Sequence, residues 1–273
     1  MSEESLRVAA VQLNSQDLIS ANLEVCFREV ESAGAQGASL VVLPENFAFL
    51  GPETDKRRLA ETLGDESAPI QKALKKMACD AGVTLVAGGF PERSPDPLRP
   101  FNSCLVLGPR GDRVAVYRKL HLFDVELPDG TQLLESEGVK SGSELEVFQL
   151  GGFTVGLSIC YDLRFPELYR ALVDRGAEVL LVPAAFTLQT GKDHWRVLLQ
   201  ARAIESQAWV VAANQWGRHP KGRSSFGHSM VVDPWGLVVA ECSDRIGAAI
   251  VDIDRDYLER VRSSIPSLRH RRL

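Results

Sequence analysis

The sequence predicts an α/β fold, in which buried strands alternate with amphipathic helices along the whole chain. Apolar segments of strand length are separated by segments in which apolar residues recur every three or four positions. A hydrophobic share of 45% and a charged share of 25% are typical of a globular protein. The sequence contains no repeat, low-complexity linker or break in composition, so we expect residues 1–273 to form a single layered α/β domain.

The first half of the chain predicts five strands and two helices. The strands are expected at the apolar segments 6–13, 39–43, 83–89, 103–107 and 113–117. A first helix is expected where Ile19, Leu23, Cys26, Val30 and Ala33 recur at helical spacing. For the second helix, Ser67 and Pro69 are typical of an N-cap and first turn, and the apolar face that follows ends at Ala81. Residues 108–111 predict a hairpin-like turn.

The second half predicts further strands and helices after an irregular stretch at 124–143. A strand at 153–159 ends at Cys160, and Pro166 opens a helix that Gly176 closes. The remaining strands are expected at 179–182, 209–213, 230–232, 237–240 and 248–253. The remaining helices are expected at 193–207 and 255–262. Sheets covered by helices are the arrangement that such a mixed order favours.

Composition argues against several classes of function. The net charge of -5 and the pI near 5.6 argue against nucleic acid as a partner, because phosphate binding requires a basic surface. No segment approaches the roughly 20 apolar residues of a membrane-spanning helix. The acidic start of the chain is unlike a signal peptide, so we expect a cytoplasmic protein. Five scattered cysteines without CxxC spacing favour neither a disulfide framework nor a zinc site.

Cys160 is the cysteine whose position indicates chemistry. It follows the buried segment VGLSI and precedes the helix that Pro166 opens. Amides at such a strand-to-helix junction lower the pKa of a thiol and can stabilise an oxyanion. The alternative is an inert buried thiol, which is the common role of a free cysteine.

Glu45 and Lys119 also lie at the ends of apolar strands. Beside apolar residues, the Glu45 carboxylate would have a raised pKa and could act as a general base and then as an acid. Lys119 could stabilise a developing oxyanion as a fixed charge. The alternatives are a solvated turn carboxylate for Glu45 and a protective edge-strand lysine for Lys119. His121 and His194 leave open a protease-like pair of cysteine and histidine.

Three segments together resemble the catalytic segments of the nitrilase (carbon–nitrogen hydrolase) superfamily. They are LPEN around Glu45, YRKLHLFD around Lys119 and ICYDLRFPELYR around Cys160, in the family's order. The resemblance covers nearly the whole chain. It implies a four-layer α-β-β-α sandwich that forms a homodimer, acts on a small-molecule amide and uses no metal or organic cofactor.

The resemblance also implies roles for individual residues. Glu45 would accept the proton of Cys160, whose sulfur attacks the amide carbonyl to form a thioester. Lys119 and the backbone N–H of Tyr161 would hold the oxyanion. Glu135, in LLES, matches a second glutamate that amidases of this family place beside the lysine.

Downstream segments resemble one branch of the family, the deaminated glutathione amidases. These segments are VPAAF, TGKDHW, QARAIESQAWVVAANQWGRH and FGHSMVVDPWG. In this branch and in the sister branch of ω-amidases, positions matching Arg164, Phe186 and Thr190 hold the keto-acid end of the substrate, which suits a guanidinium, an apolar wall and a hydroxyl. The open alternatives are an ω-amidase acting on 2-oxoglutaramate, a broader short-chain amidase, and a catalytically silent binding protein.

Overall fold

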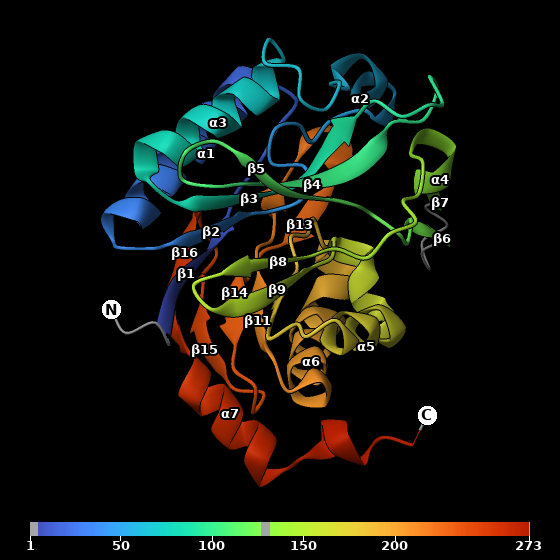
Figure 1. The fold of residues 1–273 in the computed structure, drawn as a ribbon. Coiled ribbons are helices and arrows are strands. Elements are labelled where there is room, and N and C mark those ends of the chain that lie inside the picture. Colours follow the sequence, from blue (N-terminus) through green and yellow to red (C-terminus); the bar gives the residue numbers. More distant parts are fainter. Residues whose placement is uncertain (1–4, 127–131, 273) are drawn as a thin grey trace.

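The computed structural model describes residues 5–126 and 132–272, which contain two six-stranded sheets that face each other (Figure 1). In the order β16-β1-β2-β3-β4-β5, the first sheet comprises Gly247–Asp254, Ser5–Gln12, Leu40–Leu43, Thr84–Glu92, Phe101–Leu107 and Arg113–Arg118. In the order β15-β14-β11-β10-β9-β8, the second comprises Val238–Glu241, Met230–Val232, Trp209–Ala212, Val179–Leu181, Phe153–Leu157 and Val147–Leu150.

Helices cover the outer face of each sheet. The first sheet is covered by α1 (Ile19–Ala35) and α3 (Pro69–Ala81), and the second by α5 (Pro166–Asp174) and α6 (Leu188–Ser206). The shorter elements are α2 (Glu53–Leu59), β6 (Asp124–Glu126), β7 (Gln132–Leu134), α4 (Glu135–Gly138), β12 (Trp216–Arg218), β13 (Ser224–Phe226), α7 (Arg255–Ser264) and the 3₁₀ turns η1 (Cys160–Arg164), η2 (Pro220–Gly222) and η3 (Ser267–His270).

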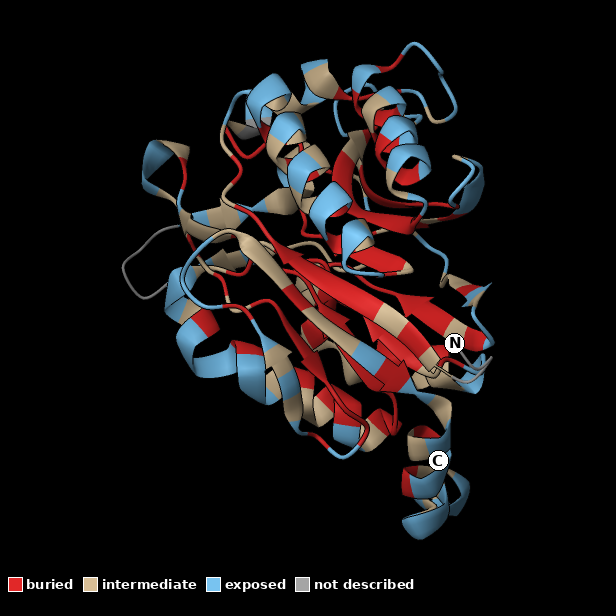
Figure 2. Cartoon of the chain, turned by 90° about the vertical axis from the view of Figure 1, so that its left-hand side faces the viewer, coloured by how far each residue is buried: buried red, intermediate tan, exposed pale blue. Residues whose placement is uncertain are grey.

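Alternate residues of the first sheet enter two separate cores. Val8 and Ala10 of β1 pack toward the second sheet, whereas Ala9 and Val11 pack toward α1 and α3. Side chains of a strand alternate between the two faces of its sheet, so a strand buried on both faces must be apolar almost throughout. Figure 2 shows the consequence, with buried strands inside and exposed helix faces outside. The predicted four-layer α-β-β-α sandwich is therefore confirmed.

The start of α3 differs from the prediction. Its N-cap is Ala68 rather than Ser67, whose hydroxyl instead donates a hydrogen bond to the Asp65 carboxylate over 2.6 Å. The carboxylate of Glu61, eight residues before the helix begins, accepts the N–H groups of Ile70 and Gln71 at 2.6 and 3.0 Å. The first turn of the helix is thus capped by a side chain from outside the usual N-cap position.

Two boundaries near the later site also differ. α6 begins at Leu188, five residues before the expected start at 193, because Thr187 accepts the N–H of Thr190 and caps it. The stretch expected to be irregular contains β6, β7 and α4, and its residues 127–131 lie outside the described residues. Within the described ranges, no helix is long and apolar enough to cross a membrane.

Candidate active site

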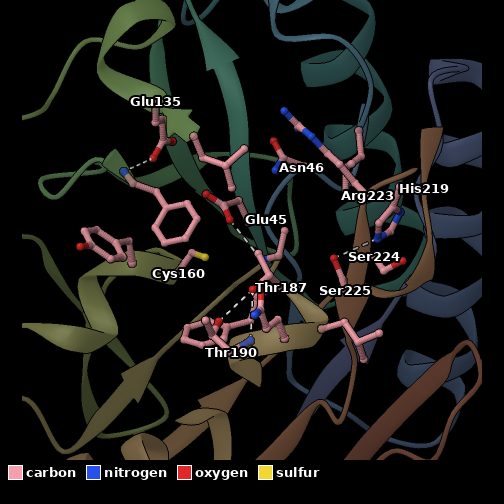
Figure 3. A pocket seen from close by; sticks show the side chains of 18 of the residues that line it. Glu45, Asn46, Glu135, Cys160, Thr187, Thr190, His219, Arg223, Ser224 and Ser225 are labelled. Atoms are coloured by element: carbon pink, nitrogen blue, oxygen red, sulfur yellow. Dashed lines mark hydrogen bonds between the residues drawn. The ribbon is translucent and has the colours of Figure 1, made fainter. Parts of the chain in front are cut away.

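A cavity of about 840 Å³ opens beyond the carboxyl ends of strands from both sheets (Figure 3). This is the edge at which ligands bind in open α/β sheets. All eight residues singled out from the sequence line it, namely Glu45, Lys119, Glu135, Cys160, Tyr161, Arg164, Phe186 and Thr190. The fold therefore brings together side chains that follow β2, β5, β7, β9 and β10.

Lys119 forms the centre of a buried charged cluster. Its Nζ donates to Glu45 Oε1 at 3.0 Å and to both carboxylate oxygens of Glu135, at 3.1 and 2.9 Å. The side chains of Lys119 and Glu45 are only 2% and 5% exposed. At such burial the Lys119 ammonium and the Glu45 carboxylate stabilise each other in their charged forms, and the charges of Glu135 and Glu45 raise the pKa of Lys119.

Backbone and amide donors fix both carboxylates of this cluster. Asn102 Nδ2 donates to Glu45 Oε1 at 2.8 Å and to Glu135 Oε1 at 3.2 Å. The N–H of Ala185 donates to Glu45 Oε2 at 3.1 Å, and that of Phe123 to Glu135 Oε2 at 2.7 Å. Donors from three separate segments thus hold the orientation of Glu45 and Glu135.

Two glycines of β3 make room for Glu45 and for the ring of Pro183. Residues 88 and 89 lie in an irregularity of the pairing with β4, through which the strand continues to Glu92. A Cβ at Gly89, where φ is +71°, would lie 2.7 Å from Cγ of Glu45, and a Cβ at Gly88 would lie 2.0 Å from the Pro183 ring. Glycine is required because the neighbouring backbone and side chains approach so closely.

Cys160 occupies a strained position at the start of η1. Its φ of +49° lies in the left-handed region, and its N–H donates to the carbonyl of Pro183 at 2.9 Å. A non-glycine residue is held there only when the surroundings determine the conformation, as at many functional sites. The thiol is partly exposed at the cavity and hydrogen-bonded to Glu45.

A fully buried carboxylate, that of Asp162, holds the turn after Cys160. It accepts the N–H of Ile159 at 2.8 Å and the hydroxyl of Tyr117 at 2.7 Å. It also accepts the backbone N–H of His121 at 3.0 Å and contacts its Nδ1 at 2.7 Å. Asp162 therefore joins the Cys160 turn to the segment that carries Lys119.

The electrostatics of the thiol and its partner differ from the prediction. Burial and the charge of Glu45 raise the pKa of Cys160 well above its ordinary value, although Lys119 and the N–H of Ala185 oppose this. Burial raises the pKa of Glu45, but the charge of Lys119 and hydrogen bonds from Cys160 and Lys119 outweigh it, so the pKa is lowered. The expected lowering for Cys160 and raising for Glu45 were both wrong. The resting pair is a neutral thiol beside an ionised carboxylate.

The remaining predicted residues form one wall of the cavity. The Arg164 guanidinium lies 5.1 Å from the ring centre of Phe186 and 5.9 Å from that of Tyr161. Thr190 Oγ1 is 2.8 Å from Thr187 Oγ1. A cation, an apolar ring and hydroxyl groups at one place can bind a small carboxylate beside an apolar chain.

The geometry does not favour a cysteine–histidine pair. His121 contacts Asp162 and stacks on Phe165, and the Nδ1 of His194 lies 3.3 Å from Arg164 Nη1. Among the described residues that line the cavity, His219 is the histidine present, and it contacts Ser15 and Ser225 instead. Nor does any group of three or more histidine, cysteine or acidic residues in 5–126 and 132–272 lie close enough to hold a metal ion.

Sequence reasoning missed Asn102 and Asp162. Asn102 is a polar residue of the largely apolar strand β4, and Asp162 lies two positions after the candidate nucleophile. Their positions in the sequence could have indicated a role, because a polar side chain that is buried requires hydrogen-bond partners. Their positions do not identify the partners, however. Glu45, which binds Asn102, lies 57 positions from it in the sequence, and Tyr117, which binds Asp162, lies 45 positions from it.

Comparison with known families agrees with this geometry. The sequence model of the family described as carbon-nitrogen hydrolase matches residues 7–263. The chain belongs to the carbon-nitrogen hydrolase family. The predicted family resemblance is thus confirmed, and the protein is an amide-hydrolysing enzyme.

Individual relatives support the assignment to the carbon-nitrogen hydrolases. The deaminated glutathione amidase of a Synechocystis species is 46% identical over 266 residues, which cover 96% of this chain and 97% of that protein. The structure of the Caenorhabditis elegans NitFhit protein has a TM-score of 0.92 and 40% identity; it covers 100% of this chain, which spans 66% of that longer chain.

A third relative bears on the chemistry of this family. An amidase from Nesterenkonia sp. AN1 has a TM-score of 0.80 and 28% identity, and the match covers 98% of this chain and 97% of that one. In that structure the acetamide moiety of fluoroacetamide is covalently added at the active-site cysteine.

Proposed function

We propose that this carbon–nitrogen hydrolase cleaves the amide of deaminated glutathione to 2-oxoglutarate and cysteinylglycine. The observation that carries the proposal is the Lys119 cluster beside the Cys160 thiol, inside a cavity that also holds Arg164. Several relatives that cover nearly the whole chain are named deaminated glutathione amidase, among them the bacterial one and the human one at 43% identity.

In the first step, Glu45 acts as the general base. It takes the proton of Cys160 as the sulfur forms a bond to the amide carbonyl carbon. The negative charge that develops on the carbonyl oxygen is stabilised by Lys119 and by the N–H of Tyr161, the residue after Cys160. This oxyanion forms in a buried site, where a fixed cation is more effective than in water.

In the second step, Glu45 returns the proton to the leaving amine. The carbon–nitrogen bond breaks, cysteinylglycine departs and a thioester remains on Cys160. A water molecule, deprotonated by Glu45, then attacks the thioester carbonyl and releases 2-oxoglutarate and the thiol. Glu135 has a positioning role, because both of its carboxylate oxygens accept hydrogen bonds from the Nζ of Lys119, which also binds Glu45.

Arg164, Phe186 and Thr190 hold the keto-acid end of the substrate in this proposal. Arg164 binds the carboxylate, Phe186 contacts the carbon chain, and Thr190 presents its hydroxyl to the oxygens. Arg164 lies in η1, the element that begins with Cys160, so the bound carboxylate and the reacting sulfur are positioned by the same short turn.

Measurement of the products tests the substrate. Purified protein is given deaminated glutathione or 2-oxoglutaramate, with Cys160→Ala as the blank, and 2-oxoglutarate and ammonia are quantified. We expect kcat/KM to favour deaminated glutathione, with 2-oxoglutarate formed and no ammonia. A preference for 2-oxoglutaramate, with ammonia, would instead assign the protein as an ω-amidase.

We also propose that the protein is a homodimer. Apolar side chains that are 51–63% exposed lie on α6 and on the adjacent turn between β14 and β15, namely Val197, Ile204, Trp235 and Leu237. The two elements are joined, since Gln200 Nε2 donates to the carbonyl of Gly236 at 2.6 Å. An exposed apolar surface of this kind is typical of a protein interface.

A cytoplasmic location is part of the same proposal. The free cysteines include the exposed Cys79, and free thiols persist in reducing compartments. Cell fractionation with an antibody against the protein tests this, and recovery in an oxidising compartment would contradict it.

A further inference from the structure

A buried histidine and a buried serine form a hydrogen-bonded pair on the cavity wall that the proposed mechanism does not use. His219 follows β12 and Ser225 lies in β13, and both line the cavity (Figure 3). Each of the two residues is 6% exposed, and Nε2 of His219 lies 2.9 Å from Oγ of Ser225. A few placed polar groups of this kind fix how a ligand is oriented in a cavity.

The protons of the His219–Ser225 pair have a fixed direction. Nδ1 of His219 lies 2.8 Å from the backbone carbonyl of Ser15. A carbonyl can only accept, so Nδ1 carries the proton of the neutral ring, and Nε2 accepts the hydroxyl proton of Ser225. Burial and the charge of Arg223 lower the pKa of His219, against the effect of the Ser15 carbonyl, so the ring is neutral at physiological pH.

Ser225 therefore presents an acceptor to the cavity. A hydroxyl has one proton and two lone pairs, and the proton of this hydroxyl is used in the bond to His219. A ligand group that meets Oγ must bring its own N–H or O–H donor. A carboxylate or ketone oxygen would face the lone pairs and be repelled. The pair thus discriminates between donors and acceptors, whereas a freely rotating serine hydroxyl serves as either.

The pair is held to the segment that presents Glu45. The carbonyl that orients His219 belongs to Ser15, whose Oγ accepts a hydrogen bond from Gln215 Nε2 over 2.8 Å. The same Nε2 donates to the backbone carbonyl of Glu45 over 3.0 Å. Figure 3 shows the pair away from Cys160, on the far side of Thr187. In the proposed mechanism Glu45 protonates the leaving amine, so the pair is placed to contact the amine portion of a substrate.

The proposed substrate has one donor that suits this acceptor. The keto-acid end of deaminated glutathione consists of a ketone and a carboxylate, which only accept. The amine portion, cysteinylglycine, brings the scissile N–H, a thiol and the N–H of its own peptide bond. The scissile nitrogen faces Glu45, and a thiol is a weak donor. The peptide N–H of the cysteinylglycine portion is therefore the group that fits.

We propose, resting on the function proposed above, that Ser225, oriented by His219, accepts the peptide N–H of the cysteinylglycine portion. Ser225 is then a specificity-determining residue, and His219 is a positioning residue that acts through it. The amine portion of 2-oxoglutaramate is ammonia, which has no peptide N–H. The pair therefore favours amides of 2-oxoglutarate whose amine portion is a peptide.

A cycle that pairs variants with substrates tests the pair. The substrates are deaminated glutathione and its ester analogue, in which an oxygen replaces only the peptide N–H of the cysteinylglycine portion. Both keep the scissile amide, so release of 2-oxoglutarate measures both. The variants are Ser225→Ala, Ser225→Cys and His219→Asn, whose amide can replace Nδ1 toward Ser15 but not Nε2 toward Ser225. The control is Ser224→Ala, which removes the neighbouring hydroxyl of the cavity wall.

For the unmodified protein we expect kcat/KM to favour the peptide over the ester by roughly tenfold, mainly through KM, because one hydrogen bond is lost and two acceptors meet. This preference should fall toward unity in Ser225→Ala, shrink in Ser225→Cys and His219→Asn, and remain in Ser224→Ala. Cleavage of the ester should persist in Ser225→Ala. A merely structural role for Ser225 predicts instead that both substrates lose equally.

The outcomes that would overturn the inference can be told apart. If the unmodified protein cleaves deaminated glutathione without preferring it to the ester, or if Ser225→Ala keeps the full preference, the pair has no part in specificity while the proposed function stands. If the unmodified protein cleaves neither substrate, the proposed function fails and the inference fails with it. If Ser225→Ala folds poorly, the nearly isosteric Ser225→Cys decides, and an undiminished preference there would contradict the inference.

Discussion

At the scale of single residues, the charges of three side chains control the reactivity of the thiol. Cys160 lies between an anion that raises its pKa, Glu45, and a cation that lowers it, Lys119. Because burial adds to the effect of the anion, the thiol stays protonated at rest and cannot act as a preformed thiolate. In the proposed mechanism, attack then depends on a base in contact with the thiol, and Glu45 is ionised and in that position.

The substitution Glu45→Gln separates thiol acidity from turnover. Loss of the base should lower kcat by about 10²- to 10⁴-fold. Loss of the negative charge should at the same time lower the pKa of Cys160, because Glu45 raises it and Lys119 remains. The ultraviolet absorbance of the thiolate against pH measures this pKa, with Cys160→Ala as the blank.

The matched controls for this experiment are His121→Ala and His194→Ala. Each of these variants should remain active, and adding Glu45→Gln to either should again lower kcat. If Glu45→Gln kept full activity while a histidine variant lost it, a cysteine–histidine mechanism would replace the one proposed. A lower pKa for Cys160 together with lost turnover would show that the enzyme needs a base more than an acidic thiol.

At the scale of elements, α6 shows how packing reverses a local preference. Gly191 lies in the first turns of this helix, and a Cβ there would lie 2.2 Å from Cβ of Phe226 in β13. The helix therefore approaches β13, whose Ser224 and Ser225 line the cavity, as closely as its backbone allows. Glycine costs helix stability but permits this contact.

We therefore expect Gly191→Ala to destabilise the protein, although alanine is the better helix former. Overpacking at a tight contact costs about 1–3 kcal/mol in the free energy of unfolding. The matched control is Gly138→Ala in α4, where a Cβ meets no atom within 4 Å and stability should be unchanged or higher. Denaturant unfolding of both variants measures the difference, and an unaltered or raised midpoint for Gly191→Ala would contradict the packing explanation.

At the scale of the whole molecule, both cores depend on the first sheet. Its strands bury one face against the second sheet and the other against α1 and α3. The cavity lies where the carboxyl ends of strands from both sheets meet, so neither sheet alone forms the candidate active site. Helix α6 has a buried face toward the second sheet and an exposed apolar face, which we assign to dimer contact.

The proposed dimer predicts a change of mass in solution. We expect the unmodified protein to sediment as a dimer at micromolar concentration. The double substitution Val197→Asp with Leu237→Asp should shift it to a monomer, since like charges would be buried face to face. Val114→Asp, at a 41% exposed position on β5, is the control that should leave the dimer intact. A monomeric unmodified protein would disprove the assignment.

Local sequence was sufficient for most strands and for the candidate catalytic residues. Runs such as 40–43 and 179–182 are apolar because both faces of those strands are buried, and Glu45 and Cys160 follow directly after such runs. The least accurate predictions were α3 and α6 at their first turns, and the segment 124–143. Their structure depends on partners such as Glu61, which accepts N–H groups of α3 from outside the helix.

The sequence by itself determined the alternation of strands and helices, the order of Glu45, Lys119 and Cys160, and through them the family. Only the tertiary structure decided the ionisation of these groups. Glu45 and Lys119 are 74 positions apart in the chain yet 3.0 Å apart in the fold. A pKa depends on burial and on charges a few ångströms away, and both exist only once the two sheets have packed together.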